Sequence, residues 1–136
     1  MPKLRGHHLI CLHFFQGEGY DAGFVENLDS VLKKTAAAPI RIVRGADDVC
    51  GRCPHCANER CIYNEHADEE TREMDKKALD LLNFDQNAEI GWGKIKEKLP
   101  AVFASWYRSY CTSCGWRKAC EKDEAFRRLS CLPVSR

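Results

Sequence analysis

The sequence predicts a mostly α fold with a short β element, in a single small domain whose metal-binding cysteine loops join the helices. Three observations predict this class. Apolar residues recur at three- and four-residue spacing in several stretches, which is the period of an amphipathic helix. A short run of β-branched residues has the pattern of a strand. Seven of the nine cysteines fall in two tight groups that flank the helical stretches.

The first helix is predicted over residues 22–36, directly after Asp21. Pro39 ends it, and the β-branched residues that follow predict a short strand over 40–43. Residues 46–64 are predicted to form a loop wrapped around the first cysteine group. The apolar positions of the helix are Phe24, Val25, Leu28, Val31 and Leu32.

The charged run DEETREMDKKALDLL predicts a second helix from Asp68, with acids early and lysines later, as the helix dipole favours. Its acids are expected to form a solvated face rather than a partner surface. Residues 83–93 are predicted to be a connector. Helix then resumes, with Pro100 as the first residue of a new helical segment that ends at Cys111. A last short helix is predicted over about 121–129. The core-facing positions of the second helix are Met74, Ala78, Leu81 and Leu82.

Length and composition predict one domain, 1–136, large enough to bury a core of its own. No apolar run reaches the roughly 18–20 residues that a membrane span needs. The N-terminal apolar stretch lacks the pattern of a secretory signal. We therefore expect a cytoplasmic protein, in which clustered cysteines stay reduced and more often bind metal than form disulfides.

The charge balance argues against nucleic-acid binding. The formal net charge is +1 with every cysteine counted as neutral. A zinc ion or a [4Fe–4S] cluster held by four thiolates adds about −2, because the bound thiols are deprotonated. The metal-loaded protein is then mildly acidic, so sequence-independent binding to phosphates is not expected.

The two cysteine groups predict metal binding. The first reads C-x2-C-x2-C-x4-C, and the second reads C-x2-C-x5-C. Zinc–sulfur bonds of roughly 2.3 Å place two ligand sulfurs about 3.8 Å apart, a spacing that a C-x2-C loop reaches easily. Iron–sulfur clusters use the same short loops, with each cysteine on its own corner. The first group is Cys50, Cys53, Cys56 and Cys61, and the second is Cys111, Cys114 and Cys120.

The residues leave several ligand sets open. The first group can close a site alone with four cysteines. If it supplies only three ligands, Cys56 and Cys61 are alternatives to each other. The second group has three cysteines, so it needs a fourth ligand or keeps a coordination position open. Its fourth ligand could be Cys11, Cys131, a histidine or a first-group cysteine. Cys11 lies between Ile10 and Leu12, which suits a buried thiol equally well.

Four histidines are further candidates. His55 and His66 flank the first group and are either zinc ligands or exposed loop residues. His7 and His8 are adjacent, so on a strand they would point to opposite faces. Either one could be a metal ligand or a proton carrier, since imidazole titrates near neutral pH. The alternative is a core histidine whose ring nitrogens bond to the backbone.

Several motifs together resemble a family of small uncharacterised bacterial and archaeal proteins, a domain of unknown function whose members are thought to bind iron–sulfur clusters. The motifs are RGHHLIC-L, GYDAGFVENLD, DDVCGRCP with a later cysteine, EMDKKAL and C-x2-C-x-W-x3-C. The resemblance runs over nearly the whole chain. It implies iron rather than zinc and favours Cys11 as a ligand, whereas Cys56 and Cys131 lie outside the pattern. The pattern positions here are Arg5, Gly6, His7, His8, Cys11, Cys50, Cys53, Cys61, Cys111, Cys114, Trp116 and Cys120.

The sequence indicates three possible functions. The first is an iron–sulfur protein, with a [4Fe–4S] cluster, that serves electron transfer or redox sensing with a redox partner protein. The alternative is a zinc-stapled structural module that binds a protein or nucleic-acid partner. The third is a small metalloenzyme, in which the second group leaves an open coordination position and His7 or His8 acts as acid or base. It ranks last, because no known catalytic motif is present.

Overall fold

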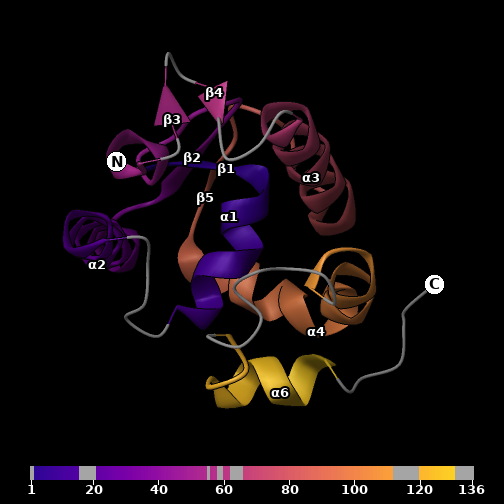
Figure 1. Ribbon diagram of the computed structural model, residues 1–136. Coiled ribbons are helices and arrows are strands. Elements are labelled where there is room, and N and C mark those ends of the chain that lie inside the picture. Colours follow the sequence, from indigo (N-terminus) through magenta and orange to yellow (C-terminus); the bar gives the residue numbers. More distant parts are fainter. Residues whose placement is uncertain are drawn as a thin grey trace.

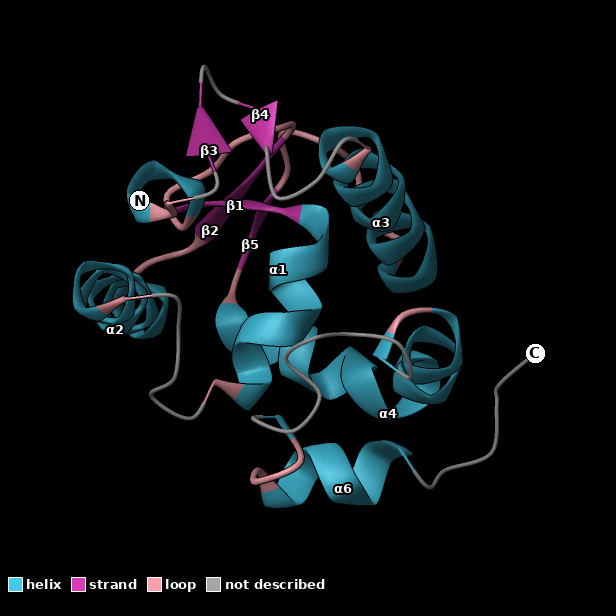
Figure 2. Ribbon diagram, in the orientation of Figure 1, coloured by secondary structure: helices cyan, strands magenta, loops and turns pink. Residues whose placement is uncertain are grey.

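The computed structural model describes residues 2–15, 21–54, 56–57, 60–61, 66–111 and 120–130. The predicted fold class is confirmed: the structure is mostly helical, with one small sheet at its centre and a short hairpin at one end (Figures 1 and 2). The helices and 3-10 turns are α1 (Gly6–Cys11), η1 (Leu12–Phe14), α2 (Ala22–Ala37), η2 (Cys50–Arg52), α3 (Ala67–Leu82), α4 (Trp92–Ser109) and α6 (Glu124–Ser130). The strands are β1 (Lys3–Arg5), β2 (Ile40–Val43), β3 (Cys56–Ala57), β4 (Arg60–Cys61) and β5 (Glu89–Ile90).

The central sheet has the order β1-β2-β5. Strand β1 runs parallel to β2, with Leu4 opposite Ile42, and β5 pairs antiparallel to β2, with Ile40 opposite Ile90. Only β2 was expected. The N-terminal strand was not foreseen, and β5 lies within the predicted connector 83–93. Both are two or three residues long and pair with a partner distant in sequence, so no local alternation marks them.

Helix α2 agrees with the predicted range to within one residue. The Asp21 carboxylate accepts a hydrogen bond from the Phe24 amide at 2.7 Å, which is the N-cap that the sequence indicates. Helix α3 also begins and ends close to its predicted bounds, and Asn83 closes it in the left-handed conformation with φ 59°.

The predicted helix break at Pro100 is wrong, because α4 continues through this residue. A proline inside a helix removes one backbone hydrogen bond. Pro100 is exposed, so water can solvate the carbonyl that loses its partner. Leu99, Phe103 and Trp106 are buried, and their burial holds the helix together on both sides of the proline.

The core lies between the central sheet and the helices. Helix α1 follows β1 directly and packs most closely on α3, while α2 and α3 lie on opposite sides of α1 (Figure 1). Gly6 permits the α1–α3 approach, since a Cβ at this position would lie 2.2 Å from the Asp75 carbonyl oxygen. Within the described residues, no helix is long and apolar enough to cross a membrane.

Candidate metal site

The site forms where β1 turns into α1. This junction places Arg5, His7 and His8 between the 44–50 loop and helix α3. The two histidines lie on helix α1, so the opposite faces that a strand would give them do not apply. Their ring centroids are 4.1 Å apart, and the rings are tilted by 48°.

The buried carboxylate of Asp47 holds one side of the site. One of its oxygens lies 2.7 Å from the Arg5 amide and 2.7 Å from His8 Nδ1. The other accepts hydrogen bonds from the amides of Val49 and Cys50 at 3.0 and 3.1 Å. Burial alone would raise the pKa of Asp47, but His8 and these N–H donors outweigh it and hold the pKa well below its usual range. Asp47 is therefore ionised, and each of its oxygens already accepts two hydrogen bonds.

The carboxylate of Asp75, on α3, holds the other side. One oxygen accepts a hydrogen bond from the His7 amide at 3.0 Å and lies 2.6 Å from His7 Nδ1. The second accepts one from Arg5 Nε at 2.7 Å. Burial, followed by the neighbouring His8, lowers the pKa of His7 to about 4. His7 is therefore neutral at pH 7, with its proton on Nδ1 and its lone pair on Nε2.

Arg5 connects these groups to the first cysteine group. Its side chain is 2% exposed, and Nη1 donates to the sulfur of Cys50 at 3.5 Å. Its Nη2 is buried and has no hydrogen-bond partner among the described residues. Burial alone would lower the pKa of Arg5, but Asp75 and the bond to Cys50 raise it further above its usual value, so the guanidinium stays charged.

The Cys50 thiol keeps its proton at neutral pH unless a metal binds it. Burial, followed by the charge of Asp47, raises the pKa of this thiol to about 12, and the hydrogen bonds to Cys50 only partly oppose the shift. A metal ion would displace this proton, because thiolate is the ligating form.

Successive tight turns arrange the first cysteine group. The Cys53 amide donates to the Cys50 carbonyl at 3.1 Å, and the Cys56 amide donates to the Cys53 carbonyl at 3.2 Å. Cys56 of β3 then pairs with Cys61 of β4 directly across the hairpin, so their side chains share one face. The pKa of Cys56 is raised, first by burial and next by Cys61, while Arg5 opposes the increase. These turns and the hairpin therefore connect the four cysteines, of which Cys50 lies beside Arg5.

Helix α3 also fixes the backbone of this group. Asp68 accepts a hydrogen bond from the Cys61 amide at 2.9 Å, and its other oxygen pairs with Arg72 at 2.8 Å. Asp68 and Asp75 are seven residues apart, which places them on one face of α3. The prediction that the acids of this run form a solvated face is wrong for these two, because both residues are buried.

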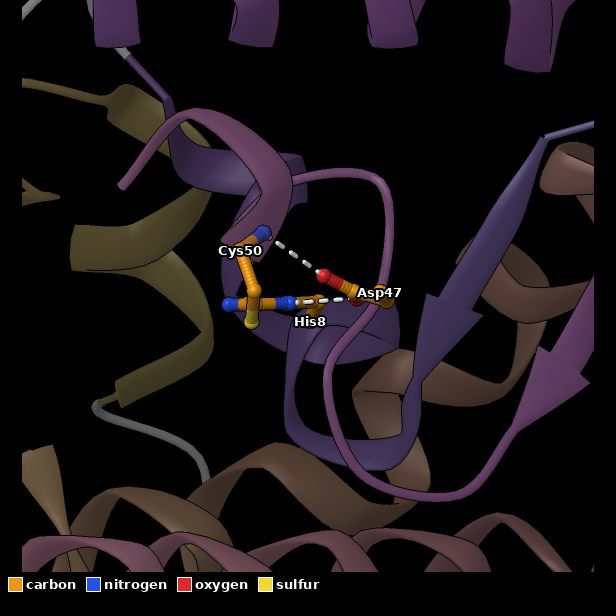
Figure 3. A group of neighbouring side chains, drawn as sticks. All are labelled: His8, Asp47 and Cys50. Carbon is orange, nitrogen blue, oxygen red and sulfur yellow. Dashed lines mark hydrogen bonds and ion pairs between the residues drawn. The ribbon is translucent and has the colours of Figure 1, made fainter. Parts of the chain in front are cut away.

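Three potential ligand atoms come together at the centre of the site. One from each of His8, Asp47 and Cys50 lie within 4.8 Å of one another, the single such group found in the described part of the chain. Figure 3 shows Asp47 bonded to one nitrogen of the His8 ring, with the other nitrogen directed away from Asp47 and the Cys50 sulfur beside the ring.

The second cysteine group is described only in part. Cys111 is buried directly after α4, and Cys120 lies shortly before α6, two helices that contact each other. Helix α6 lies at the opposite end of the molecule from the β3–β4 hairpin (Figure 1). Cys11 ends α1 and packs against the core. His66 is exposed before α3, whereas Cys114, His55, Trp116 and Cys131 lie outside the described residues.

Sequence reasoning missed Asp47 and Asp75. A signal for Asp47 exists, because it stands three residues before Cys50 and its carboxylate accepts from that amide, as an N-cap residue does. Asp75 is marked by its position three residues before the buried Ala78, on the core side of α3. Neither signal reveals which histidine each acid contacts.

The donor set fits a thiolate-bound metal. The Cys50 sulfur, in the first cysteine group, lies beside a buried guanidinium that has an unused N–H group. An anionic metal–thiolate group beside Arg5 would accept that hydrogen bond.

The family described as "Protein of unknown function (DUF1284)" matches residues 19–120. No curated protein and no solved structure matches the chain. The matched segment contains both cysteine groups, whereas the N-terminal RGHHLIC motif precedes it. Because the match spans three quarters of the 136 residues, the chain belongs to this uncharacterised family.

Proposed function

We propose that this protein binds an iron–sulfur cluster through its first cysteine group and serves electron transfer or redox sensing. The observation that carries the proposal is the buried Arg5, with Nη1 on the Cys50 sulfur and Nη2 without a partner among the described residues. An unsatisfied buried donor costs about 1–3 kcal/mol, and more when the group is charged. An anionic cluster beside Arg5 would remove that cost.

The family resemblance favours a cluster over a single zinc ion. The short cysteine loops suit a cluster, because each cysteine binds a separate corner of it. Cys50, Cys53, Cys56 and Cys61 would hold the group, which supplies one-electron transfer when bound.

The residues around the cysteines would tune such a centre. Arg5 and the backbone fix the Cys50 side, and Asp68 fixes the backbone of Cys61. Hydrogen bonds to cluster sulfurs and burial are the means by which proteins set a cluster's reduction potential. Arg5 would therefore tune the reduction potential of the cluster. The partner that exchanges electrons with it would be a cytoplasmic redox protein.

A zinc-stapled module is the second candidate. The observation that favours it is the hairpin, which places Cys56 opposite Cys61 just after the turn from Cys50 to Cys53, since two cysteine pairs on short turns also suit structural zinc. Metal content separates the two candidates directly.

The test is elemental analysis together with visible and spin-resonance spectra of protein purified without oxygen. We expect iron and acid-labile sulfide, a brown colour, and a spin-resonance signal on reduction. Cys50→Ser should lose most of the iron, whereas Cys131→Ser, outside the pattern cysteines, should retain it. Colourless protein with zinc and no iron would establish the zinc candidate instead.

A further inference from the structure

We infer that His8 is a nitrogen ligand of this metal centre beside Cys50, in place of one of the other cysteines of the first group, so that the centre is a mixed cysteine–histidine site rather than an all-thiolate one. The inference rests on the proposed function and identifies one of its ligands. It follows from the contacts of His8, of Asp47 and of Arg5.

The contact with Asp47 determines which ring nitrogen of His8 carries the proton. An ionised carboxylate is only an acceptor, so the 2.7 Å contact between His8 Nδ1 and Asp47 requires the proton on Nδ1. A neutral ring then carries its lone pair on Nε2. A ligating histidine almost always donates its other ring N–H to a carboxylate or carbonyl, and Asp47 supplies that acceptor.

Asp47 itself is not the ligand. Its two oxygens already accept from His8 and from the amides of Arg5, Val49 and Cys50. Of the three residues whose ligand atoms lie within 4.8 Å of one another, His8 and Cys50 are left with an unused donor atom. Asp47 is therefore the residue that orients the ligand.

The surroundings of the Cys50 sulfur indicate a bound group. Arg5 is almost fully buried, and it directs Nη1 to the Cys50 sulfur while Nη2 has no partner in the described structure. The guanidinium of Arg5, with its unused N–H group, and the ring of His8 thus both lie close to the Cys50 thiol. A metal–sulfur group bound by Cys50 and His8 accounts for both.

His7 provides a matched control. Its Nδ1 also contacts a carboxylate, that of Asp75, and its ring lies next to that of His8. It is not part of the group that lies within 4.8 Å. Both histidines contact a carboxylate through Nδ1, but only His8 belongs to the group that includes the Cys50 thiol.

Nitrogen ligation has a redox consequence. A neutral imidazole in place of a thiolate removes one negative charge, and histidine ligands raise the reduction potential of an iron–sulfur centre. We therefore expect His8→Cys to keep the metal and to shift the potential downward.

The experiment is pulsed spin resonance on the reduced full-length protein, labelled with 15N on histidine alone and purified without oxygen. The expected result is a strong hyperfine coupling to a histidine nitrogen, which His8→Asn removes and His7→Asn retains. Zinc-containing protein would be measured after exchange with Co²⁺. Labelling of the unmutated protein provides the readout even when His8→Asn does not fold.

Two failures are distinguishable. Protein without iron refutes the proposed function, and protein that holds neither iron nor zinc refutes the inference with it. Protein that holds iron but shows no coupling to histidine nitrogen, or a coupling that only His7→Asn removes, overturns the inference and leaves the proposed function intact.

Discussion

Substituting alanine for Gly6 tests the close packing of α1 on α3, which sets the geometry of the site. The added Cβ would lie 2.2 Å from the Asp75 carbonyl oxygen and 2.8 Å from its carbonyl carbon, whereas ordinary contact begins at 3.4 Å. The neighbour is backbone and cannot rotate away. The two helices must therefore separate by about 1 Å, which exceeds the tolerance of a close-packed interior.

That separation would break the contacts of Asp75. Its carboxylate holds Arg5 and His7 at 2.7 and 2.6 Å, and an added 1 Å exceeds hydrogen-bond distance. Overpacking costs about 1–3 kcal/mol, and each lost hydrogen bond to a charged group costs about 1.5–3 kcal/mol, partly recovered by relaxation. We expect Gly6→Ala to destabilise the protein by about 4 kcal/mol, which lowers Tm by about 15 °C in a domain of this size.

Urea unfolding followed by far-ultraviolet circular dichroism at pH 7 measures the change. Gly93→Ala, in the first turn of α4, is the matched control, since its Cβ would have no neighbour within 4 Å. Alanine has the higher helix propensity, so this control should leave the protein unchanged or stabilise it by up to about 1 kcal/mol. Equal midpoints for the two variants would refute the reasoning.

Three further predictions concern groups around the core. Asp75→Asn leaves Arg5 buried without its counter-charge and should cost about 3–5 kcal/mol in urea unfolding, whereas the exposed Asp80→Asn on the same helix should cost almost nothing; equal costs would contradict a role for the ion pair. Burial, followed by Lys96, lowers the pKa of His13 from 6.5 in the unfolded chain to about 4 in the folded protein. As the pH falls from 6.5 to 4, the unfolded chain therefore binds a proton that the folded protein does not bind, and the free energy of unfolding decreases. That loss is at most about 3 kcal/mol and should be smaller in His13→Phe, which can still stack on Trp92; identical pH profiles would contradict it. Asn83 has φ 59°, so Asn83→Ala should destabilise by about 1 kcal/mol in thermal unfolding and Asn83→Gly should not; a more stable alanine variant would contradict it.

The elements predicted correctly from the sequence are those whose signals are local. Helix α2 has an N-cap residue, a period near 3.6 and a terminating proline, and its range was predicted to within one residue. Strands β1 and β5 have no such signal, because a strand of two or three residues is stabilised by its partner rather than by its own pattern. Pro100 shows the converse, a strong local signal overruled by the buried residues on both sides of it.

In the candidate site too, only the residues with local sequence signals could be predicted. Cysteine spacing identifies the first group, and the turns and hairpin that bring it together follow the chain order. The carboxylates of Asp47 and Asp75 could not be assigned, because each contacts a histidine about 40 or 70 residues away in sequence. Their pairing depends on the α1–α3 contact and on the position of the 44–50 loop.

The charges around Cys50 favour a mixed ligand set. Arg5 is the buried cation of this neighbourhood, and it is shared between Asp75 and the sulfur, while Asp47 adds a second buried negative charge. Every further thiolate increases the negative charge in a region from which water is partly excluded. A neutral imidazole ligates metal without adding charge. The Asp47 carboxylate, which adds negative charge beside Cys50, is thus also the group that would orient His8 to bind there.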